Sequence, residues 1–114
     1  MMGMYYVLDE NKNAVECTLE EASKFLVDLD SRRVAESYVG EYRISTAFMV
    51  INSNSVDYDP PILFGTFVFT IDEGEKLKQK YSTWKEAEEG HYQMVCRVEK
   101  ILNITMPTIR KLKI

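Results

Sequence analysis

One amphipathic stripe near the end of the chain constrains the fold more than any other feature. Its members recur at spacings of three, four, three, four and three, which places them in one line along a helix: Trp84, Ala87, His91, Met94, Val98 and Ile101. Thr83 and Glu86 have the spacing of a capping box, so we expect the helix to begin near Trp84 and to end near Leu102. Gly90 interrupts this helix, and a glycine there lets another segment pack close to the helix backbone.

The segments before this helix are shorter and mostly β-like. We expect strands at residues 33–39, 42–51 and 62–71, a hairpin of residues 4–8 and 14–17, a first helix over residues 19–29, and a charged connection over residues 72–80. The pattern predicts a single α+β domain spanning residues 1–114: an antiparallel sheet of about four to five strands with two helices, the long C-terminal one packed on the sheet. Pro107 is incompatible with a regular helix through the tail, so residues 103–114 are a possible C-terminal arm.

The two long strands carry apolar residues on both alternating faces. Residues 62–71 read Ile-Leu-Phe-Gly-Thr-Phe-Val-Phe-Thr-Ile, and residues 44–51 show a similar pattern. An antiparallel sheet with one face in water shows polar alternation instead. One helix layer covers one face, so the other face needs the first helix, a second subunit or a ligand, and we favour a homodimer or larger homo-oligomer.

Composition narrows the classes of partner. The net charge of −4 argues against non-specific binding to duplex DNA. The chain has no apolar run of about 18 residues and no N-terminal signal-peptide pattern, so we expect no membrane association and a cytoplasmic location. Cys17 and Cys96 match no metal spacing, and we expect neither a metal nor a cofactor.

Six residues are candidates for binding a ligand. They are Arg32, Arg33, Arg43, Thr46, Tyr58 and His91. Arginines at strand starts can hold phosphate or carboxylate in bidentate geometry, and Tyr58, in the long loop of residues 52–61, can stack on a base. The alternative for the arginines is ion pairing with Asp28, Asp30 or Glu41. If residues 33–39 and 42–51 form a hairpin, Arg43 need not share a site with Arg32.

His91 is the only histidine of the chain and falls on the apolar stripe. We interpret it first as a residue at the edge of the core that makes one or two hydrogen bonds, and second as a ligand contact or general base. No phosphate loop, nucleophile elbow or paired-acid motif accompanies it, so we identify no catalytic residue and expect a binding protein rather than an enzyme.

Several motifs in combination resemble a widespread family of small uncharacterised proteins of tailed phages and prophages. The resemblance covers about residues 4–98 and rests on these stretches: Tyr5-Tyr6-Val7-Leu8-Asp9; Asp30-x-Arg32-Arg33-Val34, Gly40 and Ser45-Thr46-x-Phe48; Pro60-Pro61-x-Leu63-Phe64-x-Thr66-x-Val68-Phe69; and Tyr81-x-Thr83-Trp84-x-Glu86-Ala87-x-x-Gly90-His91-x-x-Met94-Val95. Relatives tend to have an acid at the position of Gly65 and an Asp-His pair before the prolines. This chain lacks both, which favours binding over catalysis.

The resemblance implies an accessory role of a phage protein in the host cytoplasm. By analogy with small counter-defence proteins, we expect it to sequester a small anionic, nucleotide-type signal. Two alternatives stay open. One is an inhibitor that binds a host protein through the acidic first third, since residues 1–31 carry seven acids and two lysines. The other is a virion or assembly component.

Overall fold

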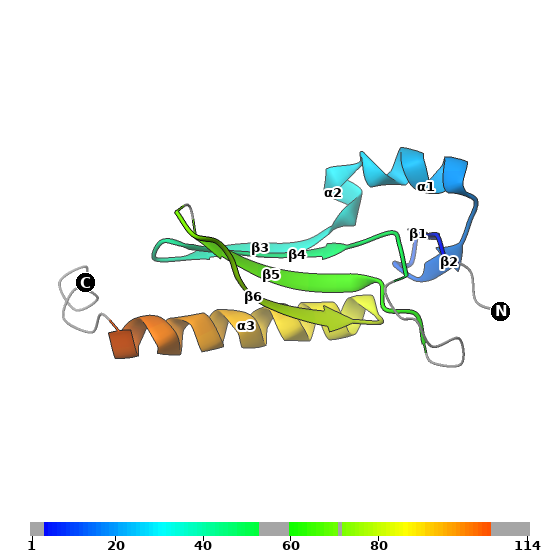
Figure 1. The fold of residues 1–114 in the computed structure, drawn as a ribbon. Helices are drawn as coiled ribbons and strands as arrows, with labels where there is room; N and C mark the ends of the chain where they lie inside the picture. Colours follow the sequence, from blue (N-terminus) through cyan, green and yellow to red (C-terminus); the bar gives the residue numbers. More distant parts are fainter. Residues whose placement is uncertain (1–3, 53–59, 71, 106–114) are drawn as a thin grey trace.

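A computed structural model describes residues 4–52, 60–70 and 72–105. Its elements follow in the order β1 (Tyr6–Leu8), β2 (Ala14–Glu16), α1 (Leu19–Leu26), α2 (Leu29–Arg32), β3 (Arg33–Val39), β4 (Tyr42–Phe48), β5 (Phe64–Thr70), β6 (Gly74–Tyr81) and α3 (Trp84–Thr105). β3 to β6 form one four-stranded antiparallel sheet in chain order, and β1 and β2 form a separate hairpin. The predicted α+β fold, with its long C-terminal helix packed on an antiparallel sheet, is confirmed (Figure 1).

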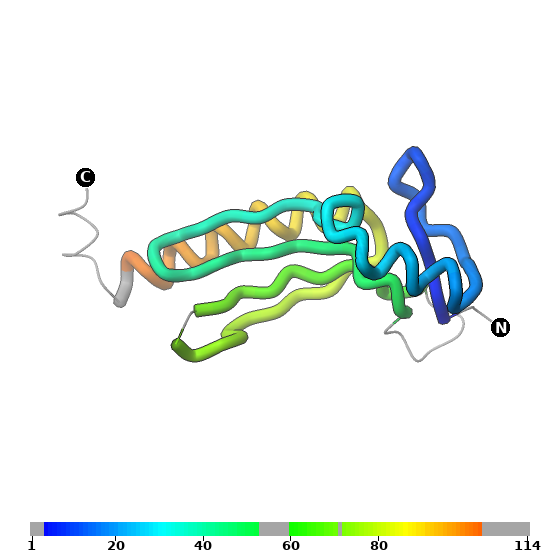
Figure 2. The backbone as a smooth tube through the Cα atoms, turned by 90° about the horizontal axis from the view of Figure 1, so that it is seen from above, coloured from blue at the N-terminus to red at the C-terminus, as the bar shows by residue number. Residues whose placement is uncertain are grey.

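Helix α3 covers one face of the sheet along the full length of the strands (Figure 1). The shorter helices α1 and α2 lie on the other side, at the end of the sheet near the hairpin (Figures 1 and 2). The sheet is therefore covered evenly on one side and only at one end on the other.

The predicted stripe of α3 faces the sheet. Ala87, His91, Met94 and Val98 are each at most 6% exposed. The predicted capping box is present, because Thr83 N donates to Glu86 Oε1 and Glu86 N donates to Thr83 Oγ1, both at 3.1 Å. The helix continues to Thr105 and so includes the first three residues of the expected arm, whereas the rest of that stretch lies outside the described residues.

Gly90 allows the close approach that its position suggests. A Cβ built on Gly90 would overlap the ring of Tyr81, the last residue of β6. Strand and helix therefore meet at a distance set by one aromatic ring lying against bare backbone. Around this seam the core divides into two clusters, one centred on Phe48, Phe64 and Ala87 and the other on Ile44, Val68 and Met94.

The structure corrects three expected boundaries. Residues 72–80 are not a loop, because β6 spans Gly74–Tyr81 and pairs with β5 along its whole length. The strand was not predicted because its sequence is rich in lysine, although charged residues are typical of an edge strand. The first helix ends at Leu26 instead of residue 29, and Asp28 caps α2 by accepting a hydrogen bond from Ser31 N.

The third correction concerns β4, which ends at Phe48 instead of residue 51. Val50 has a positive φ of 71°, a conformation that β-branched residues rarely adopt. Its carbonyl accepts a hydrogen bond of 2.8 Å from Tyr6 N at the start of β1. The chain leaves the sheet at this point and joins the N-terminal hairpin.

Candidate ligand-binding site

The face of the sheet opposite α3 carries an ordered set of aromatic and charged side chains. In an antiparallel sheet, residues directly opposite each other point to the same side. The pairing places three rows on this surface, read from β3 to β6: Tyr38, Arg43, Phe69 and Glu75; then Glu36, Ser45, Phe67 and Lys78; then Arg33, Ala47, Gly65 and Lys80. We call these twelve residues the open face.

Two phenylalanines form the centre of the open face. The rings of Phe67 and Phe69 have centroids 6.4 Å apart and planes inclined by 28°. Both residues are only partly buried, unlike Phe48 and Phe64 on the helix side, which are at most 1% exposed. The predicted apolar character of both faces is thus present, but in the single chain one of them is left partly in contact with solvent.

Beside these rings lies a shallow hollow that contains the three arginines predicted from the sequence. It has a volume of about 150 Å³ and is lined by Leu29, Arg32, Arg33, Arg43, Ser45 and Ala47. The strands β3 and β4 do form the expected hairpin, yet Arg43 reaches the same hollow as Arg32 and Arg33.

Each of the two arginines of the open face has an acidic neighbour. Arg43 Nη2 lies 2.6 Å from Glu36 Oε1, and its Nε donates to the same oxygen at 2.8 Å. The hydrogen bond and charge of Glu36 raise the pKa of Arg43 and fix the orientation of its guanidinium. Arg33 lies 3.3 Å from Asp30, whose side chain is 93% exposed, and an exposed pair of this kind contributes little energy.

Arg32 has a mainly structural role. Its Nε donates to the carbonyl of Phe48 at 2.9 Å, and its Nη1 donates to the carbonyl of Leu26 at 2.7 Å. These bonds join the end of α1 to the end of β4, and burial lowers the pKa of the guanidinium. Arg32 thus forms a wall of the hollow, and its two bonds to backbone carbonyls tie its guanidinium to the fold.

Thr46 and His91 lie together, but on the other side of the sheet. His91 is 6% exposed, and both of its ring nitrogens are hydrogen-bonded: Nε2 to Ser37 Oγ at 2.8 Å and Nδ1 to Thr46 Oγ1 at 2.7 Å. Thr46 Oγ1 also lies 2.5 Å from Thr66 Oγ1. Burial lowers the pKa of His91 and favours the neutral ring. This network satisfies polar groups of the core, as the first interpretation of His91 expects.

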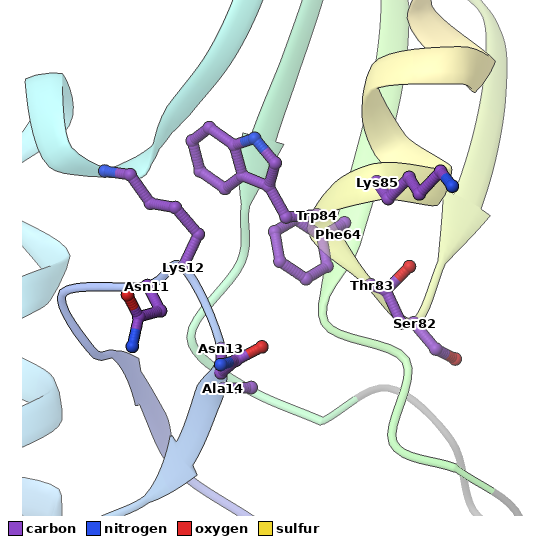
Figure 3. A pocket seen from close by; sticks show the side chains of 9 residues that line it. All are labelled: Asn11, Lys12, Asn13, Ala14, Phe64, Ser82, Thr83, Trp84 and Lys85. Atoms are coloured by element: carbon purple, nitrogen blue, oxygen red, sulfur yellow. The ribbon is translucent and has the colours of Figure 1, made fainter.

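A second cavity, of about 300 Å³, lies between the β1–β2 turn and the start of α3. Figure 3 shows Asn11 and Asn13 on the turn side, with Lys12 directed toward Trp84 and Ser82 and Thr83 on the helix side. The Lys12 ammonium lies 5.0 Å from the centre of the indole ring. The backbone N–H groups of Ser82 and Thr83 already donate to Glu86, so the helix start offers them to no anion.

Tyr58, the remaining predicted ligand contact, lies outside the described residues. The structure therefore separates the other predicted residues into an arginine hollow on the open face and a Thr46–His91 network in the core. Phe67 and Phe69 were not among the predicted site residues because the pattern of the strand predicts a sheet that is buried on both faces. Lys78 and Lys80 were missed because the strand that carries them was read as a loop.

Other kinds of site find less support. Among the residues that the structure describes, no three His, Cys, Asp or Glu side chains gather closely enough to hold a metal ion. Within the same residues, no helix has the length and apolar character needed to cross a membrane. No family model, curated protein or solved structure matches the chain.

Proposed function

We propose that this protein is a non-enzymatic binding protein that holds a small anionic, nucleotide-type ligand on the open face. One observation carries the proposal: the hollow formed by Arg33, Arg43 and Ser45 adjoins the partly exposed ring of Phe67 on the neighbouring strand. Guanidinium groups and a hydroxyl suit phosphate, and a phenyl ring suits a nucleobase. The ligand sites of proteins commonly combine an apolar surface with a few polar groups in this way.

The biological role that fits this chemistry is sequestration. A protein that holds a nucleotide signal without reacting with it removes the signal from its receptor, and the resemblance to phage accessory proteins motivates a counter-defence role of this kind. The shallow hollow buries little of a ligand in one chain, so a second copy that faces the first would complete the enclosure. That arrangement is the homodimer we favour from the sequence.

Titration calorimetry with a panel of mononucleotides and dinucleotides at low salt tests this proposal. We expect saturable binding that the double variant Arg33→Gln, Arg43→Gln weakens by about tenfold or more, since each charge-assisted hydrogen bond contributes substantially. Lys100→Gln is the matched control, because it removes a positive charge from an exposed position of α3 and should leave binding unchanged.

The single tryptophan distinguishes the two cavities. Trp84 lines the pocket of Figure 3 and lies on the helix side, so a ligand on the open face should leave its fluorescence unchanged. Binding that quenches Trp84 and survives the arginine substitutions would place the ligand in that pocket and overturn the assignment to the open face. Absence of binding by any nucleotide would overturn the proposed function itself.

A second candidate function, inhibition of a host protein, is favoured by the surface of α1 and α2. Leu26, Val27 and Leu29 are 43%, 78% and 62% exposed beside the acidic side chains of the first third. Exposed apolar residues surrounded by charge are typical of protein interfaces. Capture of a specific basic host protein from lysate that Val27→Asp abolishes and Arg43→Gln does not would support this function over the first.

A further inference from the structure

The spacing of the aromatic rings on the open face defines the ligand more narrowly. Phe67 and Phe69 are two residues apart on β5, so their rings repeat along the strand with a centroid separation of 6.4 Å. Single-stranded nucleic acids bind protein surfaces by stacking successive bases on successive aromatic side chains. Two neighbouring rings of similar inclination provide two base-sized surfaces, whereas one base needs only one ring.

Gly65 explains how the ring of Phe67 lies. A Cβ on Gly65 would come within 2.9 Å of Phe67 Cε2 and Cζ and within 3.2 Å of Met49 Sδ. The phenyl ring therefore leans along β5 and occupies the space above the glycine. Phe67 is only partly buried, so part of this ring remains in contact with solvent and is available for stacking.

The charges around the rings indicate where the phosphate goes. On the β4 side, Phe69 lies opposite Arg43 and Phe67 lies opposite Ser45. On the β6 side, Phe69 lies opposite Glu75, which repels an anion, and Phe67 lies opposite Lys78. A phosphate that links two bases, one on each ring, is therefore favoured on the β4 side, where the acid Glu36 is already neutralised by its ion pair with Arg43.

Arg43 has donors to spare for this phosphate. Glu36 engages its Nε and Nη2, which leaves the Nη1 hydrogens for a second partner and holds the guanidinium in place. Further along the strand, Arg33 and Lys80 flank Gly65 and Ala47, where the next phosphate of a longer chain would lie. The open face carries four cations and two acids, although the whole chain has a net charge of −4.

We infer that the open face binds two nucleobases joined by a phosphodiester, with one base on Phe67, the other on Phe69 and the phosphate at Arg43 and Ser45. This inference rests on the proposed function and narrows its ligand from a nucleotide to a dinucleotide unit. The same chemistry occurs in a free dinucleotide, linear or cyclic, and in a short single strand.

The test measures affinities by calorimetry for thymidine monophosphate, the linear dithymidylate, a cyclic dinucleotide and a six-residue oligothymidylate. We expect a dinucleotide to bind about tenfold or more tightly than the mononucleotide, since each stacked base contributes on that scale. An affinity that rises further with the six-residue strand identifies a single strand as the source of the ligand. An affinity that is highest for a dinucleotide identifies the free compound.

Phe69→Leu provides the decisive variant because it keeps an apolar side chain on the strand. It should reduce the affinity for a dinucleotide about tenfold and leave the affinity for the mononucleotide within about twofold, since Phe67 still stacks one base. Tyr92→Leu, which removes a 70% exposed aromatic ring from the outer surface of α3, should change neither affinity. Circular dichroism verifies that each variant is folded.

The outcomes separate this inference from the proposed function. Equal affinities for mononucleotide and dinucleotide, both weakened by Arg43→Gln, would overturn the inference and leave the proposed function standing. No binding of any nucleotide, together with a dimer in sedimentation equilibrium that Phe69→Leu dissociates, would overturn both and assign the open face to a second copy of the chain.

Discussion

The two faces of the β3–β6 sheet are built from the same strands but meet different demands. The face toward α3 is mostly apolar, and its hydroxyls of Ser37, Thr46 and Thr66 form one hydrogen-bonded network with His91. The open face has partly exposed phenylalanines between rows of charged residues. Substitutions on the first face should therefore change the stability of the fold, and substitutions on the second should change binding.

The two glycines that contact aromatic rings show the same contrast. Gly90 meets Tyr81 between helix and strand, where neither element can withdraw without opening the core. Gly65 meets Phe67 on the open face, and both residues belong to the same strand, β5. Both faces thus contain a close contact between a glycine and an aromatic ring, but the overlap is more severe at Gly90, where a Cβ would lie closer to the ring than the 2.9 Å found at Gly65.

The largest expected effect is that of His91→Ala. It leaves a cavity and removes the hydrogen-bond partner of two hydroxyls, those of Ser37 and Thr46, so we expect a loss of about 3 kcal/mol in the free energy of unfolding, or about 12 °C in Tm. Urea denaturation measures it, with Tyr92→Ala as the exposed neighbouring control. A loss below about 1 kcal/mol would contradict the assignment of His91 to the core.

The next effect compares the two glycines directly. Gly90→Ala should destabilise the fold by about 1–3 kcal/mol through overpacking against Tyr81, although alanine is the better helix former. Adding Tyr81→Leu should restore part of this loss by making space. Gly65→Ala should cost less than Gly90→Ala in the same thermal-melting experiment, and the reverse order would break the comparison between the faces.

Acidification should destabilise the helix side in a defined range of pH. Burial lowers the pKa of folded His91 below its ordinary value of about 6.5, so the unfolded chain binds the proton more readily. The stability contribution is complete above about pH 6.5 and is lost as the pH falls through that value toward the folded pKa. Urea midpoints at pH 7.5 and 5.5 should therefore differ, and His91→Gln should reduce the difference.

The smallest effect on stability belongs to the open face. The double substitution Lys78→Gln, Lys80→Gln removes two exposed cations that form no ion pair with any described residue. We expect an unchanged urea midpoint together with weaker, less salt-dependent nucleotide binding. A lowered midpoint with unchanged binding would assign these lysines to the fold.

The sequence predicted the helix side well because its signals are local and periodic. The stripe of α3, its capping box and the close approach at Gly90 follow from spacing along one helix. The open face was harder to predict because the exposure of its residues depends on which strands lie side by side and on which elements cover them. Phe67 and Phe69 look the same as core residues in a sequence, and only the position of the helices shows that they are partly exposed.

The candidate site was predicted in part for the same reason. Arg32, Arg33 and Arg43 were chosen for their chemistry, and their meeting in one hollow depends on the reach of long side chains across β3 and β4. Thr46 was chosen without knowing which face it occupies. One residue of shift along a strand reverses the face of every side chain, so small errors of register decide such assignments.

The left-handed backbone of Val50 has a consequence for how the chain partitions itself. Residues 49–51 have the alternation of a strand, and the sheet would extend through them if Val50 relaxed to an extended conformation. Two features keep Val50 in its left-handed conformation. One is the hydrogen bond that Tyr6 N donates to its carbonyl, and the other is the burial of its side chain, which is 1% exposed. The N-terminal hairpin thus helps to determine where β4 ends, although β1 and β2 are not part of the four-stranded sheet.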